Sequence, residues 1–507
     1  MSNKQGNIKL SAALSYGVIL FSIAAGLFYT PWMVKQIGRD DYGLYILVTT
    51  FLAYFVVDYG MWQSINKLLS QYRAEGNEQK IKQTIGVATK IYLFFDIVIC
   101  VVLCCVYFFI DTIFGSLSPT ELVKFKTVFL IAGAFSVLNF PFGFVRGVMY
   151  SFEYLTQSRY YELAGKIGLI ITTIIVLLLG GGLYWLVLVY AFVPLVKNIL
   201  SVQFLYRKGV RMDFRFWSRE AAMSIFGISV WLLFYVLAEL FVNNISPTII
   251  SIRNSLEQVS VFAIGLTIYS YVYQITNSVA GLFLPKVSKM RLHGQHKEID
   301  DYAIKIGRLQ LIITGFLVFG IIVSGSQFIN AWMGEAFANS YYVACLMTIP
   351  GLIIYSQQIE LAKLYAENKI FLQSAMMLLT AITSVTLSYI LTPEYGAIGA
   401  AIGIAASNFV FMAVGMNVIY RKVLNFDSKK FYTFIGKFVG VFTAVALLIM
   451  AFTKYIYEPY FLLSNEWLNF LFVASIYAAL YCVSVYFLLM NRSEKELVIS
   501  IIKKIKR

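Results

Sequence analysis

Charged residues are scarce in this sequence. They make up 13% of its 507 residues, and hydrophobic residues make up 59%. In soluble proteins about 25% of all residues are charged. With a mean hydropathy of +0.74, the composition excludes an ordinary soluble domain. It predicts an all-α protein that crosses a membrane many times.

Cysteine and histidine are also few, and their positions argue against a metal or disulfide site. His293 and His296 lie in a polar loop without a third ligand nearby, and no DxD motif is present to hold a metal-bound sugar nucleotide. We therefore expect no metal and no other cofactor. All five cysteines fall inside apolar segments: Cys100, Cys104, Cys105, Cys345 and Cys482.

Long polar segments are missing as well, so there is no room for a catalytic domain outside the membrane and we do not expect an enzyme. The net charge is +15, which in a soluble domain could indicate nucleic-acid binding. Here Lys and Arg lie in short loops between apolar stretches, so no nucleic acid is expected. The first apolar stretch, Leu10 to Val34, exceeds the roughly 7–15 residues of a signal-peptide core and predicts an uncleaved first span.

The apolar stretches predict about fourteen transmembrane helices, since a bilayer core of roughly 30 Å needs about 20 helical residues. Breaks between helices are expected at Gly180–Gly182, Ser246–Pro247 and Thr392–Glu394. The predicted spans are 10–34, 43–66, 84–112, 121–147, 160–180, 183–206, 220–244, 258–284, 306–327, 339–362, 369–391, 395–420, 432–456 and 464–490.

The distribution of Lys and Arg predicts the orientation of these helices. One set of alternate connections, together with both termini, holds nearly all of them, and by the positive-inside rule this set is cytoplasmic. Both termini are then cytoplasmic, which agrees with an even number of spans. Lys197 falls inside a span, and the opposite set of connections holds only Lys35, Arg39, Lys124, Lys126, Arg253 and Lys454.

An internal repeat links the two halves of the chain. Residues 69–83 align with residues 287–301, and the matches Ser70/Ser288, Arg73/Arg291, Gly76/Gly294 and Ile81/Ile299 share one offset. The offset relates the second span to the eighth. An even shift of six spans gives both copies the same orientation, as in transporters built from parallel repeats. A weaker match pairs the Pro141 region with the Pro350 region.

The repeat predicts two six-helix bundles that face each other across a cavity. The expected parts are an N-terminal bundle at residues 1–206, a second bundle at 220–420, a helix pair at 432–490 and a basic amphipathic cytoplasmic tail at 491–507. Apolar residues on one face of this tail, with basic residues opposite, are typical of a helix on anionic lipid. A frayed basic tail is the alternative.

Charged residues inside predicted spans are candidates for function, because each is costly in a bilayer. With a rise of 1.5 Å per residue, Asp58, Asp96 and Lys197 lie roughly 21–24 Å below the outer ends of their helices. They would share one depth in the first bundle. These three residues either form a structural ion pair or face a wet cavity, where Lys197 binds an anionic headgroup and an aspartate takes up a proton or cation.

Three further charged residues are weaker candidates for the same cavity. Glu239 lies near the outer end of its span, and the alternative to a role in the cavity is a position in the membrane interface. Arg146 and Lys67 lie near cytoplasmic helix ends, where they either meet a phosphate at the cavity mouth or anchor the helices in the interface.

Three stretches carry a family resemblance: IGRDDYGLYIL (37–47), VVDYG (56–60) and GLFLPKVSKMRLHGQHKEI (281–299). With the fourteen spans, they make the chain resemble the bacterial polysaccharide transporter family. This family comprises the O-antigen and capsule flippases of the multidrug/oligosaccharidyl-lipid/polysaccharide exporter superfamily.

The resemblance implies a multi-pass protein of the bacterial inner membrane that moves an undecaprenyl-pyrophosphate-linked oligosaccharide from the cytoplasmic to the periplasmic leaflet. Alternating access would drive the movement without ATP, with or without a coupled proton or cation. By similarity to the lipid II flippase branch, helices 13 and 14 would guide the lipid tail. Membrane lipid, and the polymerase and chain-length machinery of the pathway, are the partners it implies.

Three rival functions remain open on the sequence. A multidrug or cation antiporter shares the two-bundle plan but usually stops at twelve helices. A lipid II flippase is the nearest rival. A membrane-embedded polysaccharide polymerase or glycosyltransferase would require a large outer loop or acidic loop residues over the lipid phosphate, and neither is present.

Overall fold

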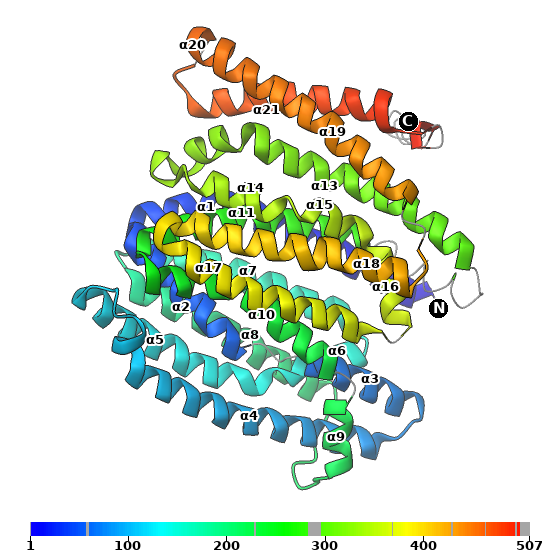
Figure 1. The fold of residues 1–507 in the computed structure, drawn as a ribbon. Coiled ribbons are helices and arrows are strands. Elements are labelled where there is room, and N and C mark those ends of the chain that lie inside the picture. Colours follow the sequence, from blue (N-terminus) through cyan, green and yellow to red (C-terminus); the bar gives the residue numbers. More distant parts are fainter. Residues whose placement is uncertain are drawn as a thin grey trace. The chain divides into compact units, whose positions relative to one another are not determined.

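The structure is a computed structural model that describes residues 2–56, 60–227, 230–281, 290, 296–367, 369–426, 429–461, 463–491 and 494–496. Within these residues the chain is nearly all helical and contains no strand (Figure 1). This confirms the predicted class of an all-α membrane protein.

The chain forms its helices in the predicted order. The first half contains α1 (Ser2–Ile37), α2 (Arg39–Val56), α3 (Met61–Ala74), α4 (Glu78–Ile113), α5 (Pro119–Asn139), η1 (Phe140–Phe142), α6 (Phe144–Ser151), α7 (Leu155–Leu178), α8 (Leu183–Arg207), α9 (Arg219–Gly227) and α10 (Val230–Arg253). The second half contains α11 (Leu256–Gly281), α13 (His296–Met333), η2 (Glu335–Phe337), α14 (Ser340–Thr348), α15 (Gly351–Ile354), η3 (Tyr355–Gln357), α16 (Gln358–Ala366), α17 (Ile370–Ser407), η4 (Asn408–Gly415), α18 (Met416–Val423), α19 (Lys429–Phe452), η5 (Thr453–Tyr457), α20 (Glu458–Phe461), α21 (Glu466–Ser484) and η6 (Val485–Leu489).

Twelve stretches of the described chain are long and apolar enough to cross a membrane. One of them, Ile370–Val423, is 54 residues long and contains two of the predicted spans. The predicted span at 43–66 corresponds to α2 and α3, which lie on either side of residues 57–59. The described residues of the fourteen predicted spans therefore lie mainly in helix.

The long helix α17 contains a reversal of the chain at Gly396. This residue has φ 54° and ψ −130°, a left-handed backbone that only glycine adopts readily. The Ser388 hydroxyl donates a hydrogen bond to the Ala400 carbonyl at 3.1 Å, whereas residues twelve apart in a straight helix are about 18 Å apart. The break predicted at Thr392–Glu394 is therefore confirmed, with the turn itself at Gly396.

The other two predicted breaks have different outcomes. α7 ends at Leu178 and α8 begins at Leu183, with Gly180 at φ 81° between them, so the break at Gly180–Gly182 is confirmed. The break at Ser246–Pro247 is wrong, because α10 continues through Pro247 to Arg253. Membrane helices tolerate an internal proline where neighbouring groups compensate for the freed carbonyl.

The chain folds into two compact units. The first unit contains the described residues of 1–263 and 370–407, and the second unit contains those of 264–369 and 408–507. The predicted division into two six-helix bundles, and the repeat that relates them, stay predictions. Two observations are consistent with the repeat: 3-10 turns interrupt helix at η1, which contains Pro141, and at η3, shortly after Pro350.

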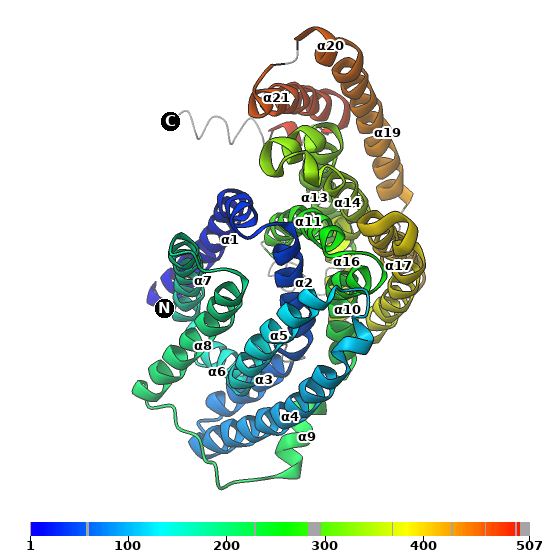
Figure 2. The ribbon, with the colours of Figure 1, turned by 90° about the vertical axis from the view of Figure 1, so that its left-hand side faces the viewer.

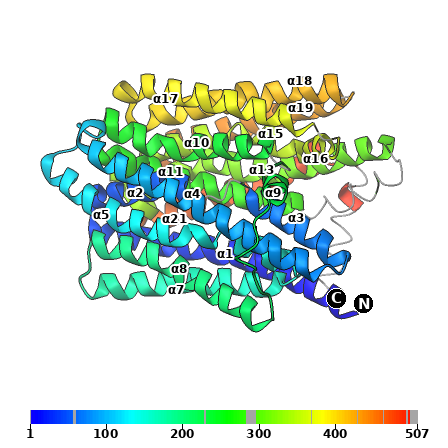
Figure 3. The ribbon, with the colours of Figure 1, turned by 90° about the horizontal axis from the view of Figure 1, so that it is seen from below.

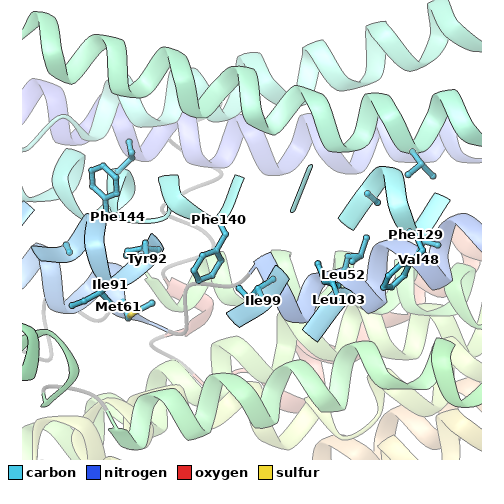
Figure 4. Packing of buried hydrophobic residues seen from close by; sticks show 14 of the residues in the cluster. Val48, Leu52, Met61, Ile91, Tyr92, Ile99, Leu103, Phe129, Phe140 and Phe144 are labelled. Atoms are coloured by element: carbon cyan, nitrogen blue, oxygen red, sulfur yellow. The ribbon is translucent and has the colours of Figure 1, made fainter. Parts of the chain in front are cut away.

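The apolar core of the first unit follows α2, α4 and α5 to the break at η1. Leu52 of α2, Leu103 of α4 and Phe129 of α5 are buried in one cluster that extends to Phe140 of η1 (Figure 4). α4 and α5 run beside each other, as Figures 1 and 3 show. This core holds α5, η1 and α6 in place, and these elements carry part of the site described below.

In the second unit, the predicted helices 13 and 14 pack against α13. The hydroxyls of Tyr477 and Tyr481 on α21 donate hydrogen bonds to the carbonyls of Phe316 and Ile312, at 2.8 and 2.6 Å. Arg308 of α13 pairs with Glu494 through contacts of 2.9 and 3.0 Å. The predicted amphipathic tail beyond residue 496 lies outside the described residues.

Candidate functional site

The first unit contains a hollow of about 590 Å³, which we call the polar cavity. Its walls come from α2, α5, η1, α6, α7 and α8. Figure 2 labels α2, α5, α6, α7 and α8. Apolar and aromatic side chains form most of the wall. Polar residues of the wall include Asn139, Arg146, Glu162, Lys197 and Asn198.

Arg146 supplies one cation of the polar cavity. It lies on α6, is exposed, and places its guanidinium 4.4 Å from the ring centre of Trp62 and 5.7 Å from that of Tyr150. Cation–π contacts of this kind orient a guanidinium without neutralising its charge. A methyl group added at Gly147 would lie 2.6 Å from the Trp62 carbonyl oxygen. Glycine at this position therefore lets α6 approach α3 closely enough for the contact between Arg146 and Trp62.

Lys197 supplies a second cation from the middle of α8. It is partly buried, and its aliphatic carbons lie against Gly165 of α7, where an added methyl group would be 3.6 Å from the Lys197 Cδ. Its ammonium is attracted by Glu162 and repelled by Arg146. The charges of both predicted cations, Arg146 and Lys197, therefore reach the polar cavity.

Glu162 is a residue of the site that the sequence reasoning missed. It lies on α7, lines the polar cavity and accepts a hydrogen bond from Arg159 at 2.6 Å. One turn further, the Lys166 ammonium donates to the Ser22 hydroxyl of α1 at 2.7 Å. Arg159, Glu162 and Lys166 recur at helical spacing, a signal that could have revealed a polar face of α7.

Two asparagines form a neutral polar part of the wall. The Asn198 amide of α8 donates to the Asn139 side-chain oxygen of α5 at 3.2 Å. The Asn139 amide donates in turn to the carbonyls of Phe135 and Ala191, at 2.9 and 3.2 Å. These bonds tie α5 to α8 and leave amide groups at the cavity, where they can exchange hydrogen bonds with a polar ligand.

The other predicted site residues do not line the polar cavity. Asp96 lies partly buried on α4, and its Oδ1 has no hydrogen-bond partner within the described part of the chain. Lys67 is exposed on α3, and Glu239 is partly buried on α10. Asp58 lies outside the described residues. The structure thus brings Arg146 and Lys197 together, and the roles predicted for the other four residues stay predictions.

A second residue that the sequence reasoning missed is Glu360 in the second unit. Its side chain on α16 is 2% exposed, and its Oε2 has no hydrogen-bond partner among the described residues. Nearby, the Gln357 amide donates to the side-chain oxygen of Asn417. Glu360 lies close to the inner end of the predicted span 339–362, where a carboxylate is usually interfacial, so no pattern in the sequence distinguishes it.

The chemistry of the polar cavity favours an anion. Two cations and one carboxylate, itself paired with Arg159, leave an excess of positive charge inside a predicted membrane span. Such charge is costly in a bilayer unless it meets water or an oppositely charged ligand. Phosphate oxygens form strong charge-assisted hydrogen bonds with Arg and Lys. The asparagine amides and the rings of Tyr161 and Tyr190 would suit a hydroxyl-rich group beside the phosphate.

Comparison with known families gives one match by sequence. A family model described as "Polysaccharide biosynthesis protein" matches residues 11–290. This range includes every residue that lines the polar cavity. No curated protein sequence matches the chain.

Solved structures with a similar fold are membrane transporters. The lipid II flippase MurJ in an inward closed conformation has a TM-score of 0.64 at 14% identity, over 96% of this chain and 99% of that chain. An inward-facing multidrug resistance MATE family transporter has a TM-score of 0.61 at 13% identity, over 82% and 99%. A MOP superfamily transporter from Pyrococcus furiosus has a TM-score of 0.53 at 16% identity, over 84% and 96%. At these identities the likeness shows a shared fold.

Proposed function

This chain belongs to the polysaccharide biosynthesis protein family, and from that premise we propose that it is a lipid flippase. Its proposed substrate is an oligosaccharide repeat unit linked to undecaprenyl pyrophosphate, for an O-antigen or capsule. It would carry this substrate from the cytoplasmic to the periplasmic leaflet of a bacterial inner membrane by alternating access.

The observation that carries this proposal is the pair of cations in the polar cavity. Arg146 and Lys197 line one hollow together with Glu162, and a pyrophosphate is the part of a lipid-linked glycan that such a pair would recognise. The amides of Asn139 and Asn198 would contact the first sugar. Nothing in this arrangement requires the substrate's covalent bonds to change, which supports transport rather than catalysis.

The energetics of the proposed transport do not demand a coupled ion. Moving two negative charges out of a negative interior gains about 2.3 kcal/mol per charge per 100 mV. Proton or cation uptake at Asp58 remains part of the proposal. The Asp58→Asn variant is expected to impair glycan export at normal protein abundance, and normal export would remove Asp58 from the transport cycle.

The proposed function is tested by removing the two cations singly. In a strain that lacks the chain, Lys197→Met and Arg146→Met are each expected to lower surface glycan about tenfold, the effect of one lost charge-assisted contact. Lys208→Met, at an exposed loop position, is the matched control and should retain full export. Full export by both cavity variants would refute the proposal.

The same strains distinguish the proposed function from a lipid II flippase, an antiporter and a polymerase. Rescue of peptidoglycan precursor export, rather than surface glycan, would identify a lipid II flippase. Drug efflux that depends on Lys197, without a glycan defect, would identify an antiporter. Accumulation of single, exported repeat units would identify a polymerase.

A further inference from the structure

A second hollow, of about 710 Å³, lies along α7 and α8 of the first unit, and we call it the apolar groove. Its α7 side includes Ala164, Gly165 and Gly168, and its α8 side includes Val193, Val196 and Leu200. Trp185, Phe192, Val196 and Leu200 of this wall are exposed. In a chain that crosses a bilayer, exposed apolar side chains of this kind face lipid.

The apolar groove meets the polar cavity at three residues. Phe135, Tyr161 and Lys197 line both hollows. Lys197 suits such a boundary because its stem is apolar and its tip is charged. An amphiphile with its anionic group in the polar cavity and its chain in the apolar groove would contact Lys197 with both parts.

The length of the apolar groove suits a long hydrocarbon chain. On α7 its lining extends from Tyr161 to Val176, which is roughly 22 Å of helix at 1.5 Å per residue. The hydrocarbon core of a bilayer is about 30 Å thick. The groove along α7 is therefore about three-quarters as long as the hydrocarbon core is thick.

Two glycines keep this path open. A methyl group added at Gly168 would meet only the Val193 Cγ1, at 4.0 Å, and the three atoms nearest to one added at Gly165 would be carbons of Lys197, at 3.6 to 3.9 Å. These distances are ordinary van der Waals contacts, so helix packing does not require glycine at either position. Larger side chains there would fill the groove without displacing the backbone.

We propose that the isoprenoid chain of the substrate lies in the apolar groove between α7 and α8 while its pyrophosphate is bound beside Lys197 and Arg146. This inference rests on the proposed function. It differs from the path implied by the family resemblance, in which helices 13 and 14, here α19 and α21, guide the tail. Charge complementarity favours this occupant, because a pyrophosphate brings two phosphates to Lys197 and Arg146 whereas a phospholipid brings one.

The test measures binding to the purified full chain in nanodiscs with three probes: inorganic pyrophosphate, farnesyl pyrophosphate and undecaprenyl pyrophosphate. In the unaltered protein the affinity is expected to rise several-fold with chain length. In Gly168→Leu that gain should be lost, while the affinity for inorganic pyrophosphate stays unchanged. Gly440→Leu on α19 is the matched control, since a methyl group there meets nothing within 4 Å, and it should behave as the unaltered protein.

Three other results of these binding measurements would contradict the groove or the proposed function. Loss of the chain-length gain in Gly440→Leu but not in Gly168→Leu would place the tail on α19 and refute the groove. Displacement of undecaprenyl pyrophosphate by phosphatidylglycerol at equal concentration would make the groove a general lipid site. Failure of inorganic pyrophosphate to bind, or binding that Lys197→Met leaves unchanged, would instead count against the proposed function.

Discussion

At the scale of single residues, the contacts of each intramembrane charge separate candidates that the sequence treats alike. Arg146 is stacked on Trp62 and Lys197 lies against Gly165, so both tips are held at the polar cavity. Asp96 shares the predicted depth of Lys197 but lies on α4 and does not line this hollow. Depth follows from counting residues along one helix, whereas the direction of a side chain depends on which helices surround it.

Glu162 sets the charge that a ligand meets in the polar cavity. Glu162→Gln removes the carboxylate that attracts Lys197, so we expect inorganic pyrophosphate to bind about threefold more tightly, a Coulomb effect of less than 1 kcal/mol. Isothermal calorimetry on the purified protein measures it. Glu220→Gln, at an exposed position on α9, should leave the affinity unchanged. Weaker binding in Glu162→Gln would mean that Glu162 contacts the ligand itself.

Glu360 is expected to limit stability in the second unit. Its Oε2 is buried without a hydrogen-bond partner in the described chain, and a buried polar atom of this kind costs about 1–3 kcal/mol. Glutamine keeps a polar group at this position but carries no charge, and a neutral amide costs less to bury than an ionised carboxylate. Glu360→Gln should therefore raise the thermal unfolding midpoint at neutral pH by about 1–2 °C. Light-scattering or tryptophan-fluorescence melts measure the midpoint. Glu335→Gln, at an exposed position, is the control. A lowered midpoint would show that the carboxylate makes a stabilising contact.

At the scale of helices, local sequence explains most of the ends. Asn77 caps α4 by accepting from the Lys80 amide at 3.0 Å, and Gly76 before it has φ 69°, the usual pattern where one helix ends and another begins. Ser118 and Glu121 form a capping box at the start of α5. Pro247 is the exception, because its effect on α10 depends on neighbouring groups rather than on the dipeptide.

The hairpin within α17 depends on Gly396. A side chain at this residue would strain the left-handed backbone and place its Cβ 2.5 Å from the Gln258 Oε1, which accepts a hydrogen bond from the Ala397 amide at 3.1 Å. Gly396→Val should therefore lower stability by about 2–4 kcal/mol. Fluorescence-detected gel filtration after heating measures this. Gly436→Val on α19, where a methyl group meets nothing within 4 Å, is the control, and equal stability of the two variants would contradict the role of Gly396.

At the scale of the whole molecule, the helices and the basic connections predict the same topology. Both termini are expected on the cytoplasmic side, together with the α8–α9 connection, and the α7–α8 turn on the opposite side. Cysteine substitution tests this after the five free native cysteines have been replaced. An impermeant maleimide should label Leu179→Cys in intact cells. It should label Lys208→Cys only after the membrane has been opened. The reverse pattern would invert the proposed direction of transport.

The sequence alone determined the fold class and the approximate positions of the spans, although twelve stretches of the described chain meet the length and hydropathy of a span where fourteen were predicted. The reason is physical: a bilayer imposes a fixed thickness and excludes unpaired backbone groups, so each span is a local property of about 20 residues. It also identified Lys197 as a charge that requires an explanation, because a charge in a span is costly wherever the neighbouring helices lie. Arg146 was a weaker candidate, since a cation near a helix end also serves as an interfacial anchor.

The tertiary structure decided which of these charges meet. Arg146 on α6, Glu162 on α7 and Lys197 on α8 reach one cavity only because α5, α7 and α8 pack around it, and Lys197 also borders the apolar groove. The direction of a side chain across a helix bundle is set by contacts between residues far apart in the sequence. No pattern within a single span encodes those contacts, so the site and the path proposed for the lipid tail required the folded chain.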